Sequence, residues 1–398
     1  PKINEDLAVL PEFTNTHPYS NQSAIQGNLE LIYNLQQQLL EITGMDEITL
    51  QPAAGAHGEL TGLMIIKSYF EDEKEKRTTI ITPDSSHGTN PASATMCGFN
   101  TITLKSNERG QVDLKDLKQH LTKDVAAIML TIPNTLGIFE ENIIEITELA
   151  HKNGSLVYMD GANMNALMGI VKPKDMGIDI LHLNLHKTFS TPHGCGGPGS
   201  GPVAVIRKLE PFLPLPRIEK KGNQFTLNYI KVRSIGRVKS FYGNFGVMIK
   251  AYAYITALGT EGIKKATEHA VLNANYLKEK LKHHYHLKYN YLCKHEFVLD
   301  DSNLPNGITT ADIAKRLIDY NFHPPTTYFP LIVHGAIMIE PTETENKETL
   351  YNCAYALIKI KEEAKNNPEI IKNAPNSTPV NRLDDVKAAR QPILKYSK

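Results

Sequence analysis

The chain has 398 residues, of which 41% are hydrophobic, and its 43 basic residues balance 43 acidic ones. This length supports a large core and more than one domain, and the balanced charge argues against a nucleic-acid surface or an acidic binding tail. The four cysteines lack CxxC spacing, so we expect no structural zinc site, no other metal and no disulfide framework. No apolar run reaches the roughly 18 residues of a membrane helix, and we expect a cytoplasmic protein without a membrane partner.

The first strongly periodic segment is residues 23–43, where apolar residues recur at helical spacing until Gly44, a typical C-terminal cap. Short apolar runs then alternate with amphipathic segments. The runs predict strands at 79–82, 100–104, 126–132, 155–159, 179–185 and 202–206. The amphipathic segments predict helices at about 58–70, 88–97, 113–121 and 142–153. Strands buried on both faces that alternate with helices predict an α/β domain with a mainly parallel sheet.

The pattern changes after residue 206, where PFLPLPRIEKKGNQ is rich in proline and charge and predicts a long surface loop. Further helices are predicted at roughly 245–258, 261–282, 309–320 and 344–364. Short strands among the later helices predict a smaller α+β domain, followed by a surface tail from residue 366. We therefore divide the chain into an N-terminal arm and helix (1–50), a large domain (51–250) and a small C-terminal domain with its tail (251–398).

Polar segments directly follow four of the predicted strands. They are SSHGTNPAS (85–93), PNTLG (133–137), DGANMN (160–165) and HK (186–187). Because ligands bind beyond the carboxyl ends of the strands in an open parallel sheet, we expect these segments to form one site. Each segment taken alone is equally well explained as an ordinary loop.

Two ionisable residues stand out at these strand ends. Asp160 follows an apolar strand, where a carboxylate needs a partner, although it could instead cap a loop or helix. Lys187 also ends an apolar strand, which predicts a buried amine of the kind used in Schiff-base chemistry rather than a surface lysine. Pyridoxal phosphate needs this pair, because an amine bonds its aldehyde and a carboxylate keeps its pyridine nitrogen protonated.

The turn PAAGAHGEL (52–60) precedes a helix, so the backbone N–H groups of Gly55 and Ala56 could face a phosphate. Such helix starts are common, and this signal alone is weak. His87 could lie flat over a planar ring, although a histidine after a strand is more often only hydrogen-bonded.

Other motifs are excluded by their details. The segment GCGGPGSG (194–201) is no P-loop, because GK[ST] does not follow it; its glycines predict space for cofactor and backbone. His182 lies in a predicted strand and His186 directly follows it; four residues of extended chain span roughly 13 Å, which argues against a shared metal, and His182 is interpreted as structural. No GxSxG elbow of a hydrolase is present.

Eight segments together resemble a known family. They read PAAGAHGE, SSHGTNPASA, MDGANMNALMG, HLNLHKTFSTPHGCGGPGSGPV, SIGRVKSFYGNFG, HPPTTYFPLIV, IEPTETE and TPVNRLDDVKAARQP. The chain resembles the glycine dehydrogenase (decarboxylating) family, the P-protein of the glycine cleavage system, and most of all the second subunit of its two-subunit bacterial form. The resemblance implies the aspartate-aminotransferase fold (fold type I), with a large domain on a mainly parallel seven-stranded sheet and a smaller C-terminal α+β domain.

The resemblance also implies roles around the cofactor ring. Lys187 would hold pyridoxal 5'-phosphate covalently, and Asp160 would pair with its ring nitrogen. His87 would stack on one face of the ring, and Ala162 would pack against the other. These roles agree with the chemistry that the strand ends suggest.

Four further residues are implied at the edge of the cofactor. Gly55, Ala56 and His186 would lie near the phosphate, and Thr135 would lie near the cofactor or the substrate. Cys195 departs from the family, because many relatives carry glycine at this place in the loop.

The implied reaction is the decarboxylation of glycine, with release of CO2 and transfer of the aminomethyl group to the lipoyl arm of the H-protein. The implied partners are glycine, the lipoylated H-protein and the first subunit of the P-protein in an α2β2 assembly. Two alternatives stay open. The chain could be another fold-type-I amino acid decarboxylase or lyase, which needs no lipoyl partner. It could also be a non-catalytic subunit, although the presence of both Asp160 and Lys187 argues against this.

Overall fold

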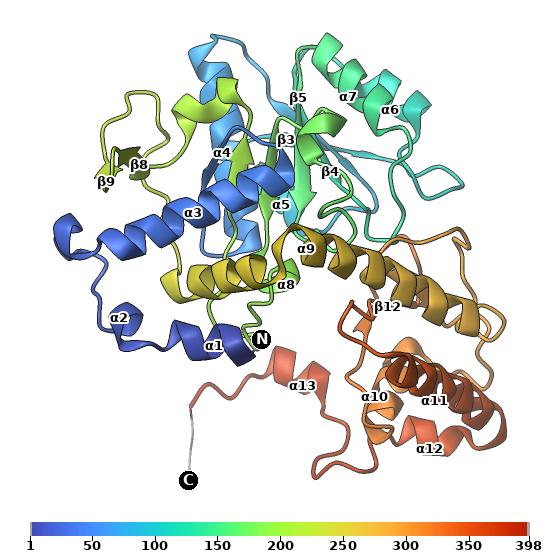
Figure 1. Cartoon of the computed structure of the whole chain (residues 1–398). Coiled ribbons are helices and arrows are strands. Elements are labelled where there is room, and N and C mark those ends of the chain that lie inside the picture. The colour runs from blue at the N-terminus through green and yellow to red at the C-terminus, as the bar shows by residue number, and fades with distance from the viewer. Residues whose placement is uncertain (1, 396–398) are drawn as a thin grey trace.

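A seven-stranded sheet lies at the centre of the larger part of the computed structural model, which describes residues 2–395 (Figure 1). Its strands are β1 (Glu47–Thr49), β2 (Thr79–Pro83), β3 (Asn100–Leu104), β4 (Val125–Thr131), β5 (Leu156–Gly161), β6 (Ile180–Leu183) and β7 (Val203–Val205). Across the sheet the order is β1-β7-β6-β5-β4-β2-β3; β2 to β6 are parallel, and β7 is antiparallel to both its neighbours. The predicted mainly parallel sheet is therefore confirmed.

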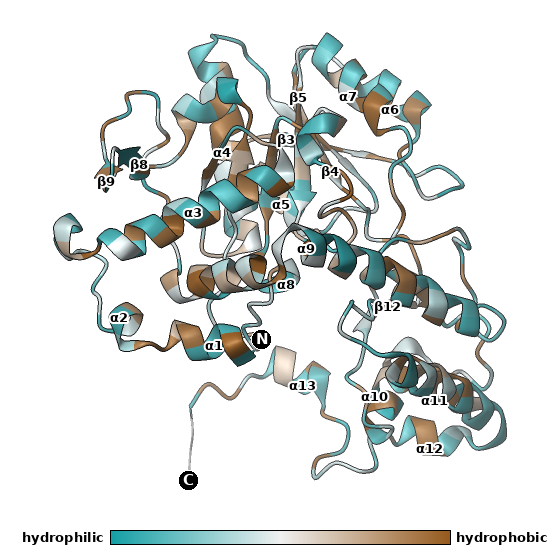
Figure 2. Cartoon of the chain, in the orientation of Figure 1, coloured by the Kyte–Doolittle hydropathy of each residue, from teal (hydrophilic) through white to brown (hydrophobic). Residues whose placement is uncertain are grey.

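Helices cover both faces of this sheet. The faces belong to two separate hydrophobic clusters, and successive residues such as Ile80 and Ile81 enter different ones. One cluster includes side chains of α3 (Gln26–Thr43), α6 (Leu114–His120) and α7 (Ile143–Lys152). The other includes side chains of α4 (Gly55–Asp72) and α5 (Thr89–Met96). Burial on both faces explains the continuous apolar runs in the sequence. In Figure 2 the central helix α4 is largely hydrophobic, whereas α3 alternates hydrophobic and hydrophilic residues.

The long helix α9 (Phe245–Leu281) connects the larger part with a smaller one (Figure 1). Its first half contributes Val247 to the core of the sheet, and its second half contributes Leu277 to a separate cluster. Gly259 interrupts the helix with φ 61° and ψ −174°, which agrees with the two predicted helices 245–258 and 261–282. The division into an arm and two domains stays a proposal, and residue 250 lies inside this helix.

The smaller part is built on a three-stranded antiparallel sheet with the order β10-β12-β11. Its elements are β10 (Phe297–Asp300), β11 (Thr326–Thr327), β12 (Ala336–Ile339), α10 (Thr310–Asp319), α11 (Lys347–Asn366) and α12 (Pro368–Lys372). A small cluster joins it to the loop after β4, because Leu136 and Ile138 pack with Val298 and Val333. This contact places the ends of β10 and β12 above the carboxyl edge of the large sheet.

The structure corrects two sequence predictions. The expected surface loop after residue 206 holds the 3-10 helix η3 (Arg207–Phe212) and a hairpin of β8 (Arg217–Lys221) and β9 (Gln224–Asn228). β8 (RIEKK) is charged and mostly not buried, so it lacks the apolar alternation that marks a strand, whereas β9 (QFTLN) alternates over only five residues. The predicted strand 179–185 ends at Leu183, and a one-turn helix, α8 (Leu185–Thr188), follows it.

The remaining elements are peripheral. They are α1 (Lys2–Ala8), α2 (Pro11–Thr14), η1 (Gln22–Ala24), η2 (Pro173–Met176) and α13 (Asp385–Arg390). Residues 379–395 are exposed, as expected for a surface tail. Within residues 2–395, no helix combines the length and apolar character that crossing a membrane would require.

The kink in α9 leads to a test of stability. Gly259 has a backbone conformation that L side chains rarely adopt, and a Cβ there meets no atom within 4 Å. Gly259→Ala should therefore lower the free energy of unfolding through backbone strain alone, by about 1–3 kcal/mol. Gly246→Ala in the same helix also meets no atom, lacks the strained φ, and should be neutral or stabilising. Urea unfolding compares the two, and equal stability would contradict the strain at Gly259.

Candidate active site

A cavity of about 780 Å³ opens at the carboxyl ends of the parallel strands. All eight residues singled out from the sequence line it, namely Gly55, Ala56, His87, Thr135, Asp160, Ala162, His186 and Lys187. The four polar segments after strands therefore meet at one site. The smaller part supplies the opposite wall, with His295, Glu296, Phe329 and Glu340 among its residues.

Asp160 is an ionised carboxylate in the interior of this site. It lies near the end of β5 and is only 3% exposed. Its Oδ2 accepts from the Asn90 amide at 3.0 Å, and its Oδ1 accepts from Ala162 N–H at 3.0 Å. Burial alone would raise the pKa of Asp160, but the neighbouring His182 and these donors outweigh it and hold the pKa below its ordinary value. Since each oxygen can accept more than one hydrogen bond, the carboxylate can also pair with a protonated ring nitrogen.

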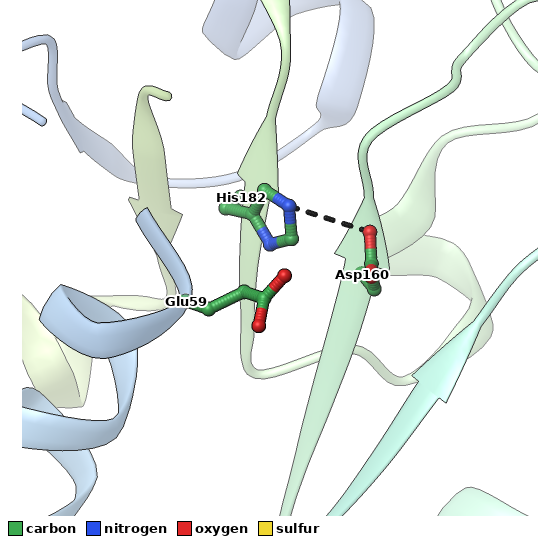
Figure 3. A group of neighbouring side chains, drawn as sticks. All are labelled: Glu59, Asp160 and His182. Carbon is green, nitrogen blue, oxygen red and sulfur yellow. Dashed lines mark ion pairs between the residues drawn. The ribbon is translucent and has the colours of Figure 1, made fainter. Parts of the chain in front are cut away.

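His182 supports Asp160 from the adjacent strand. The parallel register pairs the two residues directly, and His182 Nε2 lies 3.3 Å from Asp160 Oδ1 (Figure 3). This spacing suits an ion pair, although the angle does not meet hydrogen-bond geometry. The other ring nitrogen, Nδ1, is 2.8 Å from the Tyr158 hydroxyl. If that hydroxyl donates, the Nε2 proton faces the carboxylate, so the residue interpreted as structural is part of the site.

Glu59 completes this group and was missed by the sequence analysis. Figure 3 shows its carboxylate, which comes from α4, beside His182 and Asp160. It accepts hydrogen bonds from Thr89 Oγ1 at 2.8 Å and from Ser93 Oγ at 3.1 Å. Both hydroxyls belong to the segment SSHGTNPAS that follows β2. The segment that contains His87 therefore also holds the Glu59 carboxylate in place through these hydrogen bonds.

Lys187 projects into the cavity from α8. The expectation of a buried lysine is wrong, because Lys187 is exposed while Leu185 and Thr188 of the same turn are buried. The strand ends earlier than predicted, and the helical turn directs this side chain away from the core. Among residues 2–395, no group forms a hydrogen bond or an ion pair with Nζ, so the amine faces the cavity unoccupied by protein partners.

The start of α4 is suited to an anion. The helix begins at Gly55 and its preceding residue Ala54 provides no side-chain cap. The first backbone N–H groups therefore have no intrahelical acceptor, and the positive end of the helix dipole faces the cavity. A side chain at Gly55 would displace Asn184, because a Cβ there would lie 2.6 Å from Asn184 Oδ1.

His186 lies beside this helix start as a neutral donor. Burial, with smaller effects of His193 and Lys187, lowers the pKa of His186 to about 4. Its Nδ1 accepts from Ser200 N–H at 3.1 Å, so the proton of the neutral ring is on Nε2. A neutral histidine can donate to a phosphate but adds no positive charge.

The glycine-rich loop makes room mainly for the protein's own groups. A Cβ at Gly201 would lie 2.0 Å from Ala54 O, and a Cβ at Gly199 would lie 2.9 Å from His186 Nδ1. Gly194 and Gly196 meet nothing within 4 Å. The later glycines thus allow the loop to pack against the turn before α4. Cys195 is exposed and has φ 66°, and no contact explains its presence.

Two other predicted site residues, His87 and Thr135, form contacts with neighbouring protein groups. His87 is exposed at the cavity wall, where its Nδ1 lies 2.7 Å from Thr89 Oγ1 and its ring meets Phe329 edge-on. The Thr135 hydroxyl donates to Ser85 O. Their predicted roles beside the cofactor stay predictions.

Comparisons with known proteins agree with this geometry. Residues 58–296 match the family Aminotransferase class-V, and residues 266–381 match the family described as Glycine dehydrogenase, C-terminal domain. A relative from Caldanaerobacter subterraneus subsp. tengcongensis, named Probable glycine dehydrogenase (decarboxylating) subunit 2, is 61% identical over 100% of this chain and 82% of its own. A relative of the same name from Listeria monocytogenes is 58% identical over the same shares.

The chain belongs to the glycine dehydrogenase (decarboxylating) subunit 2 family. Solved structures of low sequence identity support its fold. A glycine decarboxylase (P-protein) of the glycine cleavage system, in inhibitor-bound form, has a TM-score of 0.76 at 20% identity and covers 90% of this chain and 82% of its own. A NifS-like protein has a TM-score of 0.69 at 17% identity and covers 92% and 96%. The expected fold type I is confirmed, and with it pyridoxal phosphate is implied as cofactor.

The residues of the cavity fit that cofactor. Asp160 provides a buried anion for the ring nitrogen, and Lys187 provides an unpaired amine. The uncapped start of α4 and the Nε2 proton of His186 provide donors for a phosphate.

The state of His186 can be measured directly. Because its pKa is lowered to about 4, its ring should not titrate between about pH 5.5 and 8, whereas an ordinary histidine titrates near pH 6.5. NMR of the cofactor-free protein with labelled histidine can follow the ring nitrogens, and His186→Asn assigns the resonance by its loss. A midpoint above about pH 6 would contradict the neutral donor.

Proposed function

We propose that this chain decarboxylates glycine with pyridoxal phosphate and transfers the aminomethyl group to the lipoyl disulfide of the H-protein. The observation that supports this most is an ionised, buried Asp160 that faces the same cavity as the free amine of Lys187. The high identity to relatives named glycine dehydrogenase (decarboxylating) subunit 2 selects glycine among the substrates of this fold.

Within this proposal, Lys187 would bond the cofactor and Asp160 would hold the proton of its ring nitrogen. His87 and Ala162 would pack on the two faces of the ring, and Thr135 would lie beside the cofactor or substrate. Gly55, Ala56 and His186 would bind the phosphate. When bound, the cofactor takes up the electron pair that the loss of CO2 leaves on the glycine carbon.

The protein's own side chains control the charge of Asp160 and the position of protons during the reaction. His182, Asn90 and Ala162 keep the Asp160 carboxylate ionised and oriented, so that it favours a protonated ring nitrogen throughout the reaction. The Lys187 amine, which lines the same cavity, would be placed to carry a proton at Nζ. A cavity of about 780 Å³ is within the usual range for a ligand of the size of the cofactor with glycine.

The partners are also part of the proposal. The relatives are named as a second subunit, and we infer a first subunit as the partner, in an α2β2 assembly. The second partner is the lipoylated H-protein, and the compartment is the cytoplasm.

Lys187→Ala tests the covalent attachment of the cofactor. The variant should lose the absorbance near about 420 nm that a lysine-bound cofactor gives, together with its activity. Lys187→Arg keeps the positive charge without a nucleophilic amine and should behave in the same way. If either variant retained this absorbance, the assignment of Lys187 as the residue that bonds the cofactor would be wrong.

Asp160→Asn tests the role of the carboxylate. It should slow glycine–bicarbonate exchange by on the order of 10²- to 10³-fold, the loss usual when one preorganised electrostatic contact is removed. Asp179→Asn is a matched control, because Asp179 is equally buried at 3% exposure but lies just before β6, at the far end of the strand. Equal losses in the two variants would show that burial, and not position, makes Asp160 important.

The function itself is tested by the exchange of labelled bicarbonate into glycine, with and without the first subunit and the lipoylated carrier. The proposal expects exchange that depends on both. Exchange without any carrier would favour another amino acid decarboxylase or lyase. A lack of cofactor absorbance in the assembled protein would favour a non-catalytic subunit.

A further inference from the structure

A pair of glutamates faces the site from the smaller part of the structure. Glu296 directly precedes β10, and Glu340 directly follows β12. These strands pair Phe297 with Ile339, so the antiparallel register brings the two glutamates side by side. One nitrogen of His295 and one carboxylate oxygen of each glutamate lie within 4.8 Å of one another. All three residues line the cavity that contains Lys187.

The two carboxyl groups have different surroundings. Glu340 Oε1 accepts from the Asn163 amide at 2.8 Å and from the Asn165 amide at 2.6 Å. These two donors hold one oxygen of the Glu340 carboxyl group in place. Glu296 has no hydrogen-bond partner for its carboxyl group among residues 2–395 and is 7% exposed. Burial raises the pKa of Glu296 well above its usual range, the charge of Glu340 adds to this, and Lys187 opposes it.

The other groups around Glu296 do not compete for its proton. His295 Nε2 lies 3.7 Å from Glu296 Oε2, and both nitrogens of His295 are buried without a hydrogen-bond partner. Burial lowers the pKa of His295, so its ring is neutral at neutral pH. Glu296 is therefore a carboxylic acid on the cavity wall, beside a fixed carboxylate and a neutral histidine.

We propose that Glu296 donates a proton to the sulfur that leaves when the one-carbon unit is transferred to the disulfide, with Glu340 as the fixed charge beside it. This inference rests on the proposed function, which supplies the disulfide as the two-electron acceptor. The electron pair left on the glycine carbon forms the C–S bond, and the S–S bond breaks. Its electron pair goes to the second sulfur, which takes the proton of Glu296, and water later returns a proton to Glu296.

The step needs an acid at this place. An alkyl thiol has a pKa near 8.5, and a thiolate beside the negative charge of Glu340 would be less stable still. A protonated carboxyl group removes that charge as it forms, which is general acid catalysis of the leaving group.

The test varies the leaving group in the assembled enzyme. The wild type should transfer labelled carbon from glycine to lipoamide and to an aryl disulfide, whose thiolate is stable without a proton. Glu296→Gln should slow transfer to lipoamide by on the order of 10²- to 10⁴-fold and leave transfer to the aryl disulfide nearly unchanged. Samples without glycine correct for reaction of the disulfide with the four cysteines.

Matched variants control for structural damage. Glu140 is also buried, its pKa is also raised by burial, and it lies outside the cavity as the acceptor of Val112 N–H. Glu140→Gln should leave the ratio of the two transfer rates unchanged. Glu296→Asp keeps an acid and should restore part of the transfer to lipoamide.

The protonation of Glu296 can be measured in the absence of cofactor and substrate. Infrared spectra of the cofactor-free protein at pH 7 should contain a carboxylic-acid band that Glu296→Gln removes. The absence of this band, equal loss with both disulfides, or no loss with either would overturn the proposal. A wild type that transfers carbon to neither disulfide would refute the proposed function and, with it, the role of Glu296.

Discussion

The site depends on one buried anion, the carboxylate of Asp160. An isolated charge in a protein interior is unfavourable, so it persists only where fixed polar groups replace water. Asn90 and Ala162 donate to its two oxygens, and His182 lies 3.3 Å from one of them. Each of these partners follows from the sheet: Ala162 is two residues along the same strand end, His182 is its neighbour in the register, and Asn90 comes from α5. The parallel sheet therefore makes an ionised Asp160 possible.

The second constraint is the placement of the smaller part over that edge of the sheet. The kinked helix α9 and the contact of Leu136 with Val298 hold the two parts together. The same contact brings Glu296 and Glu340 opposite Lys187. The asparagines that bind Glu340 belong to the segment DGANMN, which also contains Asp160. One short segment thus contains the anion for the ring nitrogen and holds Glu340 in place.

Much of this could be predicted from the sequence, because strands buried on both faces leave continuous apolar runs and their polar ends share one edge of the sheet. The eight predicted site residues line one cavity for this reason. The features that could not be predicted from the sequence depend on contacts between residues far apart in the chain. His182 supports Asp160 only through the strand register, and Glu296 meets Glu340 only through the pairing of two four-residue strands. The exposure of Lys187 depends on where β6 ends, and strand ends are weakly encoded.

The measurement that tests this account most directly concerns the proton that Asp160 is proposed to hold. The protein can be reconstituted with pyridoxal phosphate labelled with ¹⁵N in its ring, and NMR then reports whether that nitrogen carries a proton. The account predicts a protonated nitrogen at neutral pH in the wild type and in Asp179→Asn, and loss of that proton in Asp160→Asn. An unprotonated ring nitrogen in the wild type would contradict the central role of the buried carboxylate.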